Sequence, residues 1–223
     1  MLKITLKDGS TIDVEEGKLI IEVAKSISSS LAKNSVVAKL DGNLVDLKTP
    51  ITKDCSLELV TLEDPEAFPV LNHSCAHLLA QAMKRLYKNV KFGVGPSIEE
   101  GFYYDFGVEE SITSDDFAKI EAEMKKIVKE NLPINHYYLS KEEAKQKFAG
   151  DPYKCELIDA VDDDKVGIYE QGDYADVCRG PHVISTGVLK NFKLLNVAGA
   201  YWRGDSKNPM LTRIYGTCYP TSE

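Results

Sequence analysis

The stretch DYADVCRGPH, residues 173–182, decides how the larger part of this chain folds, because it must come together with HSCAH at residues 73–77. Each stretch holds two side chains of the kinds that bind metals or move protons, four residues apart: His73 and His77 in one, Cys178 and His182 in the other. On a helix, this spacing places both side chains on one face, one turn apart. We therefore predict that these two remote pairs converge on one small polar site.

Size and composition fit a globular protein with one large or two smaller cores, since the 223 residues are 43% hydrophobic and 28% charged. No run of about 18 apolar residues is present, and the alternating N-terminus is unlike a signal peptide, so we expect no membrane contact. Five scattered cysteines, an odd number, predict reduced thiols and a cytoplasmic location. The net charge of −8 argues against sequence-independent binding along a nucleic-acid backbone, but it does not exclude a local contact with one end of an RNA.

Residues 1–62 are predicted to form a small domain of their own. Alternating apolar residues, a turn at Asp8-Gly9-Ser10 and one stretch of helical periodicity predict, in order, strands at residues 2–6 and 11–14, a helix at 20–27, a hairpin at 36–47 and a strand at 57–60. Strand pairs flanking one helix in this order are typical of a small α+β, ubiquitin-like (β-grasp) fold. The domain holds eight lysines and nine acidic residues, so it offers no basic face.

Residues 63–223 are predicted to form a larger α+β domain with an antiparallel sheet and packed helices. The polar, proline-broken segment at residues 64–66 marks the expected boundary. A glycine-rich turn at residues 93–96 leads toward a strand near residues 101–106. Apolar periodicity and capping residues predict helices at residues 69–87, 117–128, 140–148 and 153–158, and strands at residues 192–195, 200–202 and 212–215.

The residues alone leave four roles open for the two pairs. A metalloprotease helix is excluded, because Ser74 stands where the general-base glutamate would follow the first histidine. Three histidines and one cysteine are a sound tetrahedral zinc set, although the sequence lacks a Cys-x-x-Cys pair. Alternatively, Cys178 is an activated nucleophilic thiol, or imidazoles and a lysine orient and deprotonate water without metal. The fourth possibility is a set of buried polar side chains with a purely structural role.

Six motifs in one order make the sequence recognisable. They are HSCAHLL at residues 73–79, FGVGP at 92–96, GFYYD at 101–105, CRGPH at 178–182, LLNVAGAYWRGD at 194–205 and RIYGT at 213–217. This series, which extends over essentially the whole chain, closely resembles the N-terminal half of bacterial threonyl-tRNA synthetases. Residues 1–62 resemble the family's TGS domain, and residues 63–223 resemble its second additional domain, which edits mischarged tRNA.

The resemblance implies an aminoacyl-tRNA deacylase that hydrolyses the ester of seryl-tRNA(Thr) to serine and free tRNA(Thr). Serine lacks only one methyl group of threonine, and such a difference yields about 1–3 kcal/mol of discrimination in a synthetic site. A second pocket that admits serine and rejects threonine corrects the error. The expected partners are the acceptor end of tRNA(Thr) carrying serine and the remainder of the synthetase. Since the motifs of an aminoacylation core are missing from this sequence, we expect a fragment that cannot activate threonine by itself.

The resemblance also implies catalytic roles for five residues. His73 and Lys154 are expected to position or activate the attacking water. His77, Cys178 and His182 are expected to shape the pocket and to hold the region of the ribose 2′- and 3′-oxygens.

Three further residues are implied in substrate binding: Asp176 for the seryl ammonium group, and Gly95 and Tyr104 for the terminal adenosine. The family is taken to work without metal, so we expect no cofactor for editing. Related alanyl enzymes hold zinc with a similar set, and the ligands here would be His73, His77, Cys178 and His182. A zinc-dependent hydrolase of small esters or amides and a non-catalytic tRNA-binding module are the alternative functions.

Overall fold

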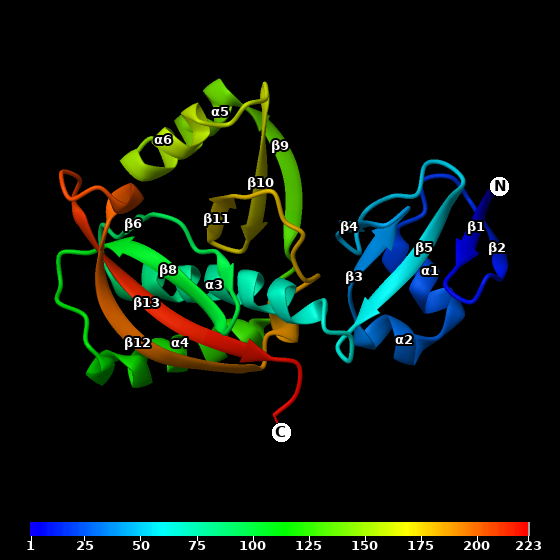
Figure 1. Ribbon diagram of the computed structural model, residues 1–223, viewed down its shortest axis with the longest axis horizontal. Coiled ribbons are helices and arrows are strands. Elements are labelled where there is room, and N and C mark those ends of the chain that lie inside the picture. The colour runs from blue at the N-terminus through cyan, green and yellow to red at the C-terminus, as the bar shows by residue number, and fades with distance from the viewer. Residues whose placement is uncertain (223) are drawn as a thin grey trace.

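The structure, a computed structural model, describes residues 1–222, which form a small N-terminal part and a larger C-terminal part (Figure 1). Both parts combine helices with sheets, as the predicted α+β class requires. Each of the five cysteines, all of them within residues 1–222, carries a free thiol. Among the helices of these residues, none is long and apolar enough to cross a membrane.

The small part is a five-stranded sheet packed on a helix, which confirms the β-grasp prediction. Its elements are β1 (Leu2–Leu6), β2 (Thr11–Val14), α1 (Ile20–Ile27), α2 (Ser29–Asn34), β3 (Ser35–Leu40), β4 (Asn43–Val45) and β5 (Cys55–Thr61). The strand order is β2-β1-β5-β3-β4, and only the central β1–β5 pair among them is parallel. Ile20 and Val23 of α1 pack with Ile4 and Leu57 of the sheet in one apolar core. Helix α2, which the periodicity did not predict, is capped by Ser28, whose side chain accepts a hydrogen bond from Leu31 N–H.

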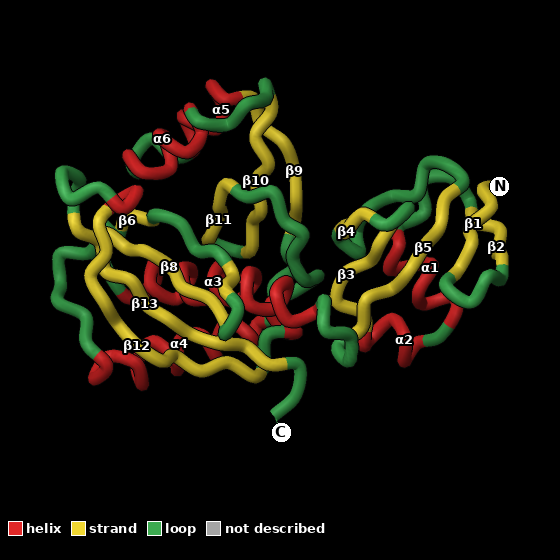
Figure 2. Tube along the Cα trace, viewed as in Figure 1, coloured by secondary structure: helices red, strands yellow, loops and turns green. Residues whose placement is uncertain are grey.

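The larger part is built on a curved antiparallel sheet with helices on one face (Figure 2). The sheet has the order β12-β13-β8-β6, with a short β7 beside β8. Its strands are β6 (Lys91–Phe92), β7 (Ser97–Ile98), β8 (Gly101–Gly107), β12 (Asn191–Tyr201) and β13 (Met210–Tyr219). Helix α3 (Ala67–Leu86) packs on β8 and β13, and helix α4 (Phe117–Glu130) packs on α3 and β12.

Helix α3 lies inside the larger part because it is apolar on most of its circumference. Fourteen of its twenty residues are buried, among them Leu71, Leu78 and Met83. A helix of this kind has to be covered on several sides, and the sheet, α4 and the segment around β11 (Tyr174–Val177) cover it. Polar side chains on such a helix are therefore held in fixed positions within the core.

A second, three-stranded sheet lies beside the first, and the loop with Cys178 and His182 follows its last strand, β11. Its order is β11-β10-β9, with β9 (Asn135–Ser140) and β10 (Lys165–Gln171), and helices α5 (Lys141–Lys147) and α6 (Pro152–Asp159) belong to the same lobe (Figure 1). The predicted capping box opens α5, since Ser140 Oγ accepts from Glu143 N–H at 3.1 Å. Ala144, Ile158 and Ile168 belong to a separate small core here.

The structure corrects one expectation about residues 173–182. Helical spacing was considered for both pairs, but here the chain forms strand β11 and then an irregular loop. Gly180-Pro181 explains the difference, because a residue before proline disfavours helical backbone and proline cannot continue a helix. Strands β9 and β10, which pair with β11 in this sheet, were also not predicted.

The small and larger parts touch each other directly. Lys48 Nζ donates hydrogen bonds to Ile134 O at 3.3 Å and to Asn135 Oδ1 at 3.0 Å. Ile184 of the larger part packs against the core of the small part. The predicted boundary between residues 62 and 63 falls between β5 and α3.

Candidate active site

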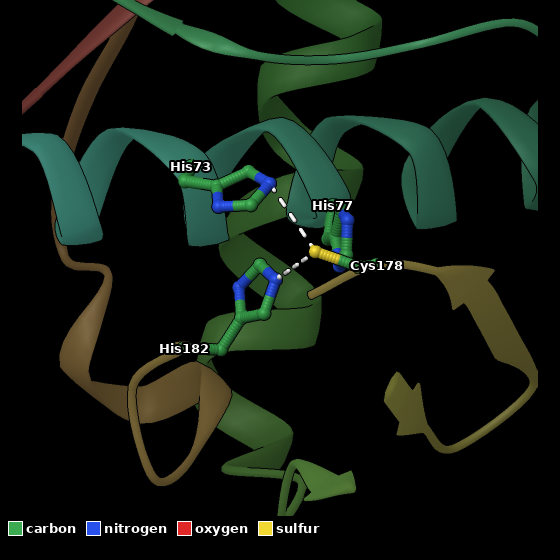
Figure 3. A group of neighbouring side chains, drawn as sticks. All are labelled: His73, His77, Cys178 and His182. Carbon is green, nitrogen blue, oxygen red and sulfur yellow. Dashed lines mark hydrogen bonds between the residues drawn. The ribbon is translucent and has the colours of Figure 1, made fainter. Parts of the chain in front are cut away.

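Four side chains from distant parts of the sequence meet in one cluster (Figure 3). His73 and His77 lie one turn apart on α3, and Cys178 and His182 lie on the loop after β11. The Sγ atom of Cys178 is 3.1 Å from Nε2 of His182 and 3.4 Å from Nε2 of His73. The ring centroid of His182 is 4.4 Å from that of His73 and 4.3 Å from that of His77. The structure thus brings together the two pairs that the sequence analysis singled out.

The loop reaches α3 through a turn that depends on glycine. Cys178 N–H continues the pairing of β11 by donating to Gly167 O at 3.0 Å. Two residues later, Gly180 has a φ of +69°, a left-handed conformation that favours glycine. A Cβ at Gly180 would also collide with the hydroxyl of Tyr169. The glycine of CRGPH therefore allows the turn that returns His182 to Cys178.

Ser74, next to His73 on α3, anchors this loop from the helix side. Its Oγ lies within hydrogen-bonding distance of His182 Nδ1, at 2.9 Å, and accepts a hydrogen bond from Val183 N–H at 3.1 Å. The residue that excludes a metalloprotease helix thus fixes the orientation of the His182 ring. This role of Ser74 was not predictable from the sequence, because nothing in the spacing distinguishes a serine that orients a histidine from one that only packs.

Behind the cluster, Asp176 is the centre of a buried network of charged and polar groups. Its carboxylate forms an ion pair with Lys154 and accepts hydrogen bonds from the hydroxyls of Tyr104 and Tyr174, at 2.6 Å each. The same carboxylate lies 3.4 Å from Nε2 of His77. Asp176 is 2% exposed, and protein groups engage both of its oxygens. The network ties β11 to α3, because it joins Asp176 to His77.

Lys154 of α6 has a partner for each of its three ammonium protons. Besides the ion pair with Asp176, it donates to Gly93 O at 2.8 Å and to the hydroxyl of Tyr104 at 3.0 Å. The side chain is 3% exposed. Lys154 and Asp176 therefore neutralise each other inside the protein. Activation of water by Lys154, or binding of an ammonium group by Asp176, would require one of these bonds to open.

Gly95 and Tyr104 lie against each other beside this network. A Cβ at Gly95 would overlap the ring of Tyr104. Tyr104 itself is fully buried, and its hydroxyl faces Asp176 and Lys154. The half-buried backbone of Gly95, rather than the Tyr104 ring beneath it, is thus the part of this pair that a ligand can reach.

Burial sets the protonation of the cluster. It lowers the pKa of His73 from its ordinary value and lowers the pKa values of His77 and His182 well below theirs. It raises the pKa of the Cys178 thiol to about 12. At neutral pH the cluster therefore holds three neutral imidazoles and a protonated thiol. Neutral imidazoles can accept protons, whereas a protonated thiol is a poor nucleophile.

The cluster has the chemistry of a zinc site. One ligand atom from each of its four residues lies within 4.8 Å of the others. Zinc binds nitrogen at about 2.0–2.1 Å and sulfur at about 2.3 Å, so tetrahedral ligand atoms lie roughly 3.3–3.8 Å apart. The widest separation between ligand atoms would have to shorten by about 1 Å around the ion, whereas Cys178 Sγ, at 3.1 Å and 3.4 Å from Nε2 of His182 and His73, is already as close as zinc binding requires. The donors that would hold zinc are His73, His77, Cys178 and His182.

Two cavities flank the loop that carries Cys178 and His182. One of about 520 Å³ lies between the small and larger parts and is lined by Pro181 and His182. The other, of about 510 Å³, lies beside β10 and is lined by Val94 and Cys178. Arg179, which is exposed, borders both cavities. A ligand can therefore approach the loop from either side.

Two further members of the network were missed from the sequence. Tyr174 lies two residues before Asp176, and the two-residue period of a strand directs both side chains to one face. Recognition of β11 as a strand would therefore have found Tyr174. Gly93 contributes through its backbone carbonyl, which no side-chain pattern signals.

Two family models match the chain. The TGS domain matches residues 2–61, which cover the small part. The domain described as the Threonyl and Alanyl tRNA synthetase second additional domain matches residues 166–215. This second match begins one residue inside β10 and includes β11 and the loop with Cys178 and His182.

The chain is also similar over nearly its whole length to proteins named threonine--tRNA ligase. It is 53% identical to the protein of Thermotoga petrophila over 225 residues, which are 100% of this chain and 35% of the relative. It is 56% identical to the protein of Staphylococcus saprophyticus over 219 residues, 98% of this chain and 34% of the relative. Threonine--tRNA ligase 1 of Bacillus subtilis is 54% identical over 222 residues, again 98% and 34%. The chain thus spans about a third of the length of the curated relatives it matches.

Proposed function

Because the chain carries the TGS domain and the second additional domain of the threonyl-tRNA synthetase family, we propose that it hydrolyses seryl-tRNA(Thr), the product of a mistaken charging of tRNA(Thr) with serine. The observation that supports this most is the meeting of three imidazoles and one thiol from α3 and the loop after β11. The proposed partners of the chain in this reaction are the acceptor end of tRNA(Thr) carrying serine and the remainder of a synthetase.

In the proposed reaction, His73 is the general base. It is a half-buried imidazole, and its lowered pKa keeps it neutral at pH 7, so it can take a proton from water. The water oxygen attacks the ester carbon, and the bond from this carbon to the ribose oxygen breaks. The proton then passes from His73 to the departing ribose oxygen. Serine and tRNA(Thr) are the products, and no other reactant is consumed.

Lys154 and Asp176 act in this proposal through their contacts with other residues. Asp176 lies 3.4 Å from His77, and Lys154 supplies the positive charge that stabilises the buried Asp176 carboxylate. The Tyr104 and Tyr174 hydroxyls complete this network. We therefore propose that this network fixes the position of His77. This role replaces the two that the resemblance alone implied, which were activation of water by Lys154 and binding of the seryl ammonium group by Asp176.

His77, Cys178 and His182 form the wall that we assign to the seryl group and the neighbouring ribose oxygens. Ser74 holds His182, and Asp176 lies against His77, so the wall cannot widen easily. An added methyl group in a packed site of this kind costs about 1–3 kcal/mol. Threonine is therefore disfavoured where serine fits. The backbone of Gly95 is the proposed contact for the terminal adenosine.

A zinc-dependent hydrolase of small esters or amides is the second candidate. The observation that favours it is the set of four ligand atoms within 4.8 Å of one another. Zinc held by His73, His77, Cys178 and His182 would supply a Lewis acid at the same place. The metal-free reaction is our first choice because His73 provides a neutral base without it.

The test of the proposed function is the deacylation rate of seryl-tRNA(Thr) with the His73→Gln variant, which keeps a polar side chain but lacks a basic nitrogen. Loss of a general base lowers kcat by about 10²–10⁴-fold. The wild-type rate should rise with pH through a pKa below 6.5 and then level off, because only the deprotonated imidazole accepts a proton. An unchanged rate in His73→Gln would remove His73 from the mechanism.

A further inference from the structure

One side chain of the small part reaches directly into the loop of the candidate active site. Asp46 follows β4, and its Oδ1 accepts a hydrogen bond from His182 N–H at 2.8 Å. Its Oδ2 accepts a hydrogen bond from the hydroxyl of Tyr169 at 2.6 Å and lies 3.6 Å from Nδ1 of His136. One carboxylate thus contacts three segments of the larger part, the loop with His182, β10 with Tyr169 and β9 with His136.

We propose that Asp46 is a positioning residue of the active site, which makes the small N-terminal part a component of the editing machinery. Asp46 fixes the backbone of His182 and the hydroxyl of Tyr169, and so fixes the loop on which Cys178 and His182 lie. In this role it acts through His182 and Tyr169 rather than through a contact with the substrate. This inference deepens the proposed function and rests on it for its kinetic test.

This arrangement holds His182 at two points, its ring and its backbone. Ser74 of α3 orients the ring through Nδ1, and Asp46 holds the backbone N–H. The Asp46 hydrogen bonds are charge-assisted, and such bonds are roughly twice as strong as neutral ones. Without Asp46, the ring of His182 would keep its partner while the backbone that carries the ring would be free to shift.

Tyr169 extends the influence of Asp46 to the rest of the loop. Its ring packs edge-on against His182, with centroids 4.4 Å apart, and stacks on His136 at 4.3 Å. Its hydroxyl lies where a side chain at Gly180 would be. Tyr169, whose hydroxyl donates to Asp46, therefore borders the loop with its hydroxyl at Gly180 and with its ring at His182.

The backbone around Asp46 is itself held by hydrogen bonds and by the core of the small part, which a positioning residue requires. Leu47, the next residue, is 1% exposed in the core of the small part. Its carbonyl accepts a hydrogen bond from Ile21 N–H at 2.8 Å, and Asp46 O accepts one from Thr49 N–H at 3.1 Å. The segment that carries Asp46 is thus hydrogen-bonded to α1 and packed into the core of the small part.

The experiment compares four variants of the whole chain in single-turnover deacylation of seryl-tRNA(Thr). Asp46→Ala removes both hydrogen bonds. Asp46→Asn keeps an acceptor for His182 N–H and places an amide beside the Tyr169 oxygen. Lys48→Ala removes two further hydrogen bonds between the two parts, those to Ile134 O and Asn135 Oδ1, without removing any bond to His182. Asp54→Asn is a matched change elsewhere in the small part, where Asp54 accepts only a hydrogen bond from Lys3 N–H.

We expect Asp46→Ala to lower the maximal rate by about tenfold to a hundredfold, the size of effect that a displaced catalytic group produces. The substrate concentration for half-maximal rate should stay unchanged, because Asp46 acts through His182 and Tyr169 rather than through a contact with the substrate. Asp46→Asn should recover most of the rate, and Lys48→Ala and Asp54→Asn should retain it. If Asp46→Ala does not fold, Tyr169→Phe decides, since it removes the second hydrogen bond and should lower the maximal rate in the same way.

Three results would overturn the inference: a wild-type rate in Asp46→Ala, an effect confined to substrate affinity, or an equal loss in Lys48→Ala. Hydrogen exchange of the His182 amide separates this inference from the proposed function. The amide should exchange faster in Asp46→Ala than in the wild type, whereas in Lys48→Ala its exchange should be unchanged. If the wild-type chain does not hydrolyse seryl-tRNA(Thr), the proposed function fails, and this exchange measurement alone decides whether Asp46 holds the loop.

Discussion

At Cys178, burial and the hydrogen bond from Gly180 N–H act on the thiol in opposite directions, and burial dominates. The pKa therefore rises to about 12, although Arg179 is adjacent in the sequence. The nucleophilic-thiol hypothesis needs the reverse, because reactive cysteines have lowered pKa values. The thiol instead contributes volume and a weak hydrogen-bonding group between His73 and His182.

Alkylation of Cys178 by iodoacetamide tests this protonation state. At pH 8, a thiol of pKa about 12 is ionised about a thousandfold less than one near 9, so native Cys178 should react far more slowly than the same cysteine in urea. Mass spectrometry of the peptide that contains Cys178 gives both rates. Equal rates in the native and unfolded chain would restore the nucleophilic-thiol hypothesis.

Residue types and spacing were sufficient to predict the four members of the cluster, but not the residues that hold them in position. His73 and His77 were recognisable because a helical spacing of four is diagnostic on α3. Ser74 acts on His182 across a tertiary contact, and Gly93 acts through a carbonyl, so neither carries a local signal.

The loop after β11 is the element on which the site depends, because it replaces the helix that the spacing of Cys178 and His182 allowed. Its partner α3 was predictable from apolar periodicity, with a start two residues earlier than expected. Strands β9 and β10 were harder to predict, since cross-strand pairing rather than local pattern defines them. Helix α3 was therefore predictable from its own residues, whereas the conformation of the loop depends on contacts with other elements.

Two glycine variants distinguish the effect of the loop's backbone conformation on stability from the effect of its packing. Gly180 and Gly204 both have a φ of +69°, but a Cβ would meet Tyr169 at Gly180 and open space at Gly204. Alanine at either position costs about 1–2 kcal/mol for the left-handed conformation. Gly180→Ala should lose about 1–3 kcal/mol more from the collision, together with most of the deacylation rate. Urea unfolding measures the difference, and equal losses in the two variants would show that the Tyr169 contact is unimportant.

The ion pair between Lys154 and Asp176 joins α6 to β11 inside the protein. Lys154→Met leaves the buried carboxylate without its counter-charge, which costs about 3–5 kcal/mol of unfolding free energy. Lys147→Met is the matched control, because Lys147 pairs with Glu170 near the surface, and such pairs contribute about 0–1 kcal/mol. Denaturant unfolding of both variants checks this ordering. Similar losses would mean that the buried pair contributes little.

On the scale of the whole molecule, the α+β class and the β-grasp fold of the small part were predictable from sequence. The contact between the two parts was not, because Asp46 belongs to the small part and lies 123 residues before Tyr169 and 136 residues before His182. The site is thus assembled by the tertiary structure of both parts, although its four central side chains come from one of them.

The most direct measurement of the central claim is the hydrolysis of seryl-tRNA(Thr) and threonyl-tRNA(Thr) by the whole chain, each with and without a zinc chelator. We predict rapid release of serine, slow release of threonine, and rates that the chelator does not change. Loss of serine release with the chelator, restored by added zinc, would favour the zinc-dependent reaction. Equal stability of both esters in the presence of the chain would contradict an editing function for the cluster of His73, His77, Cys178 and His182.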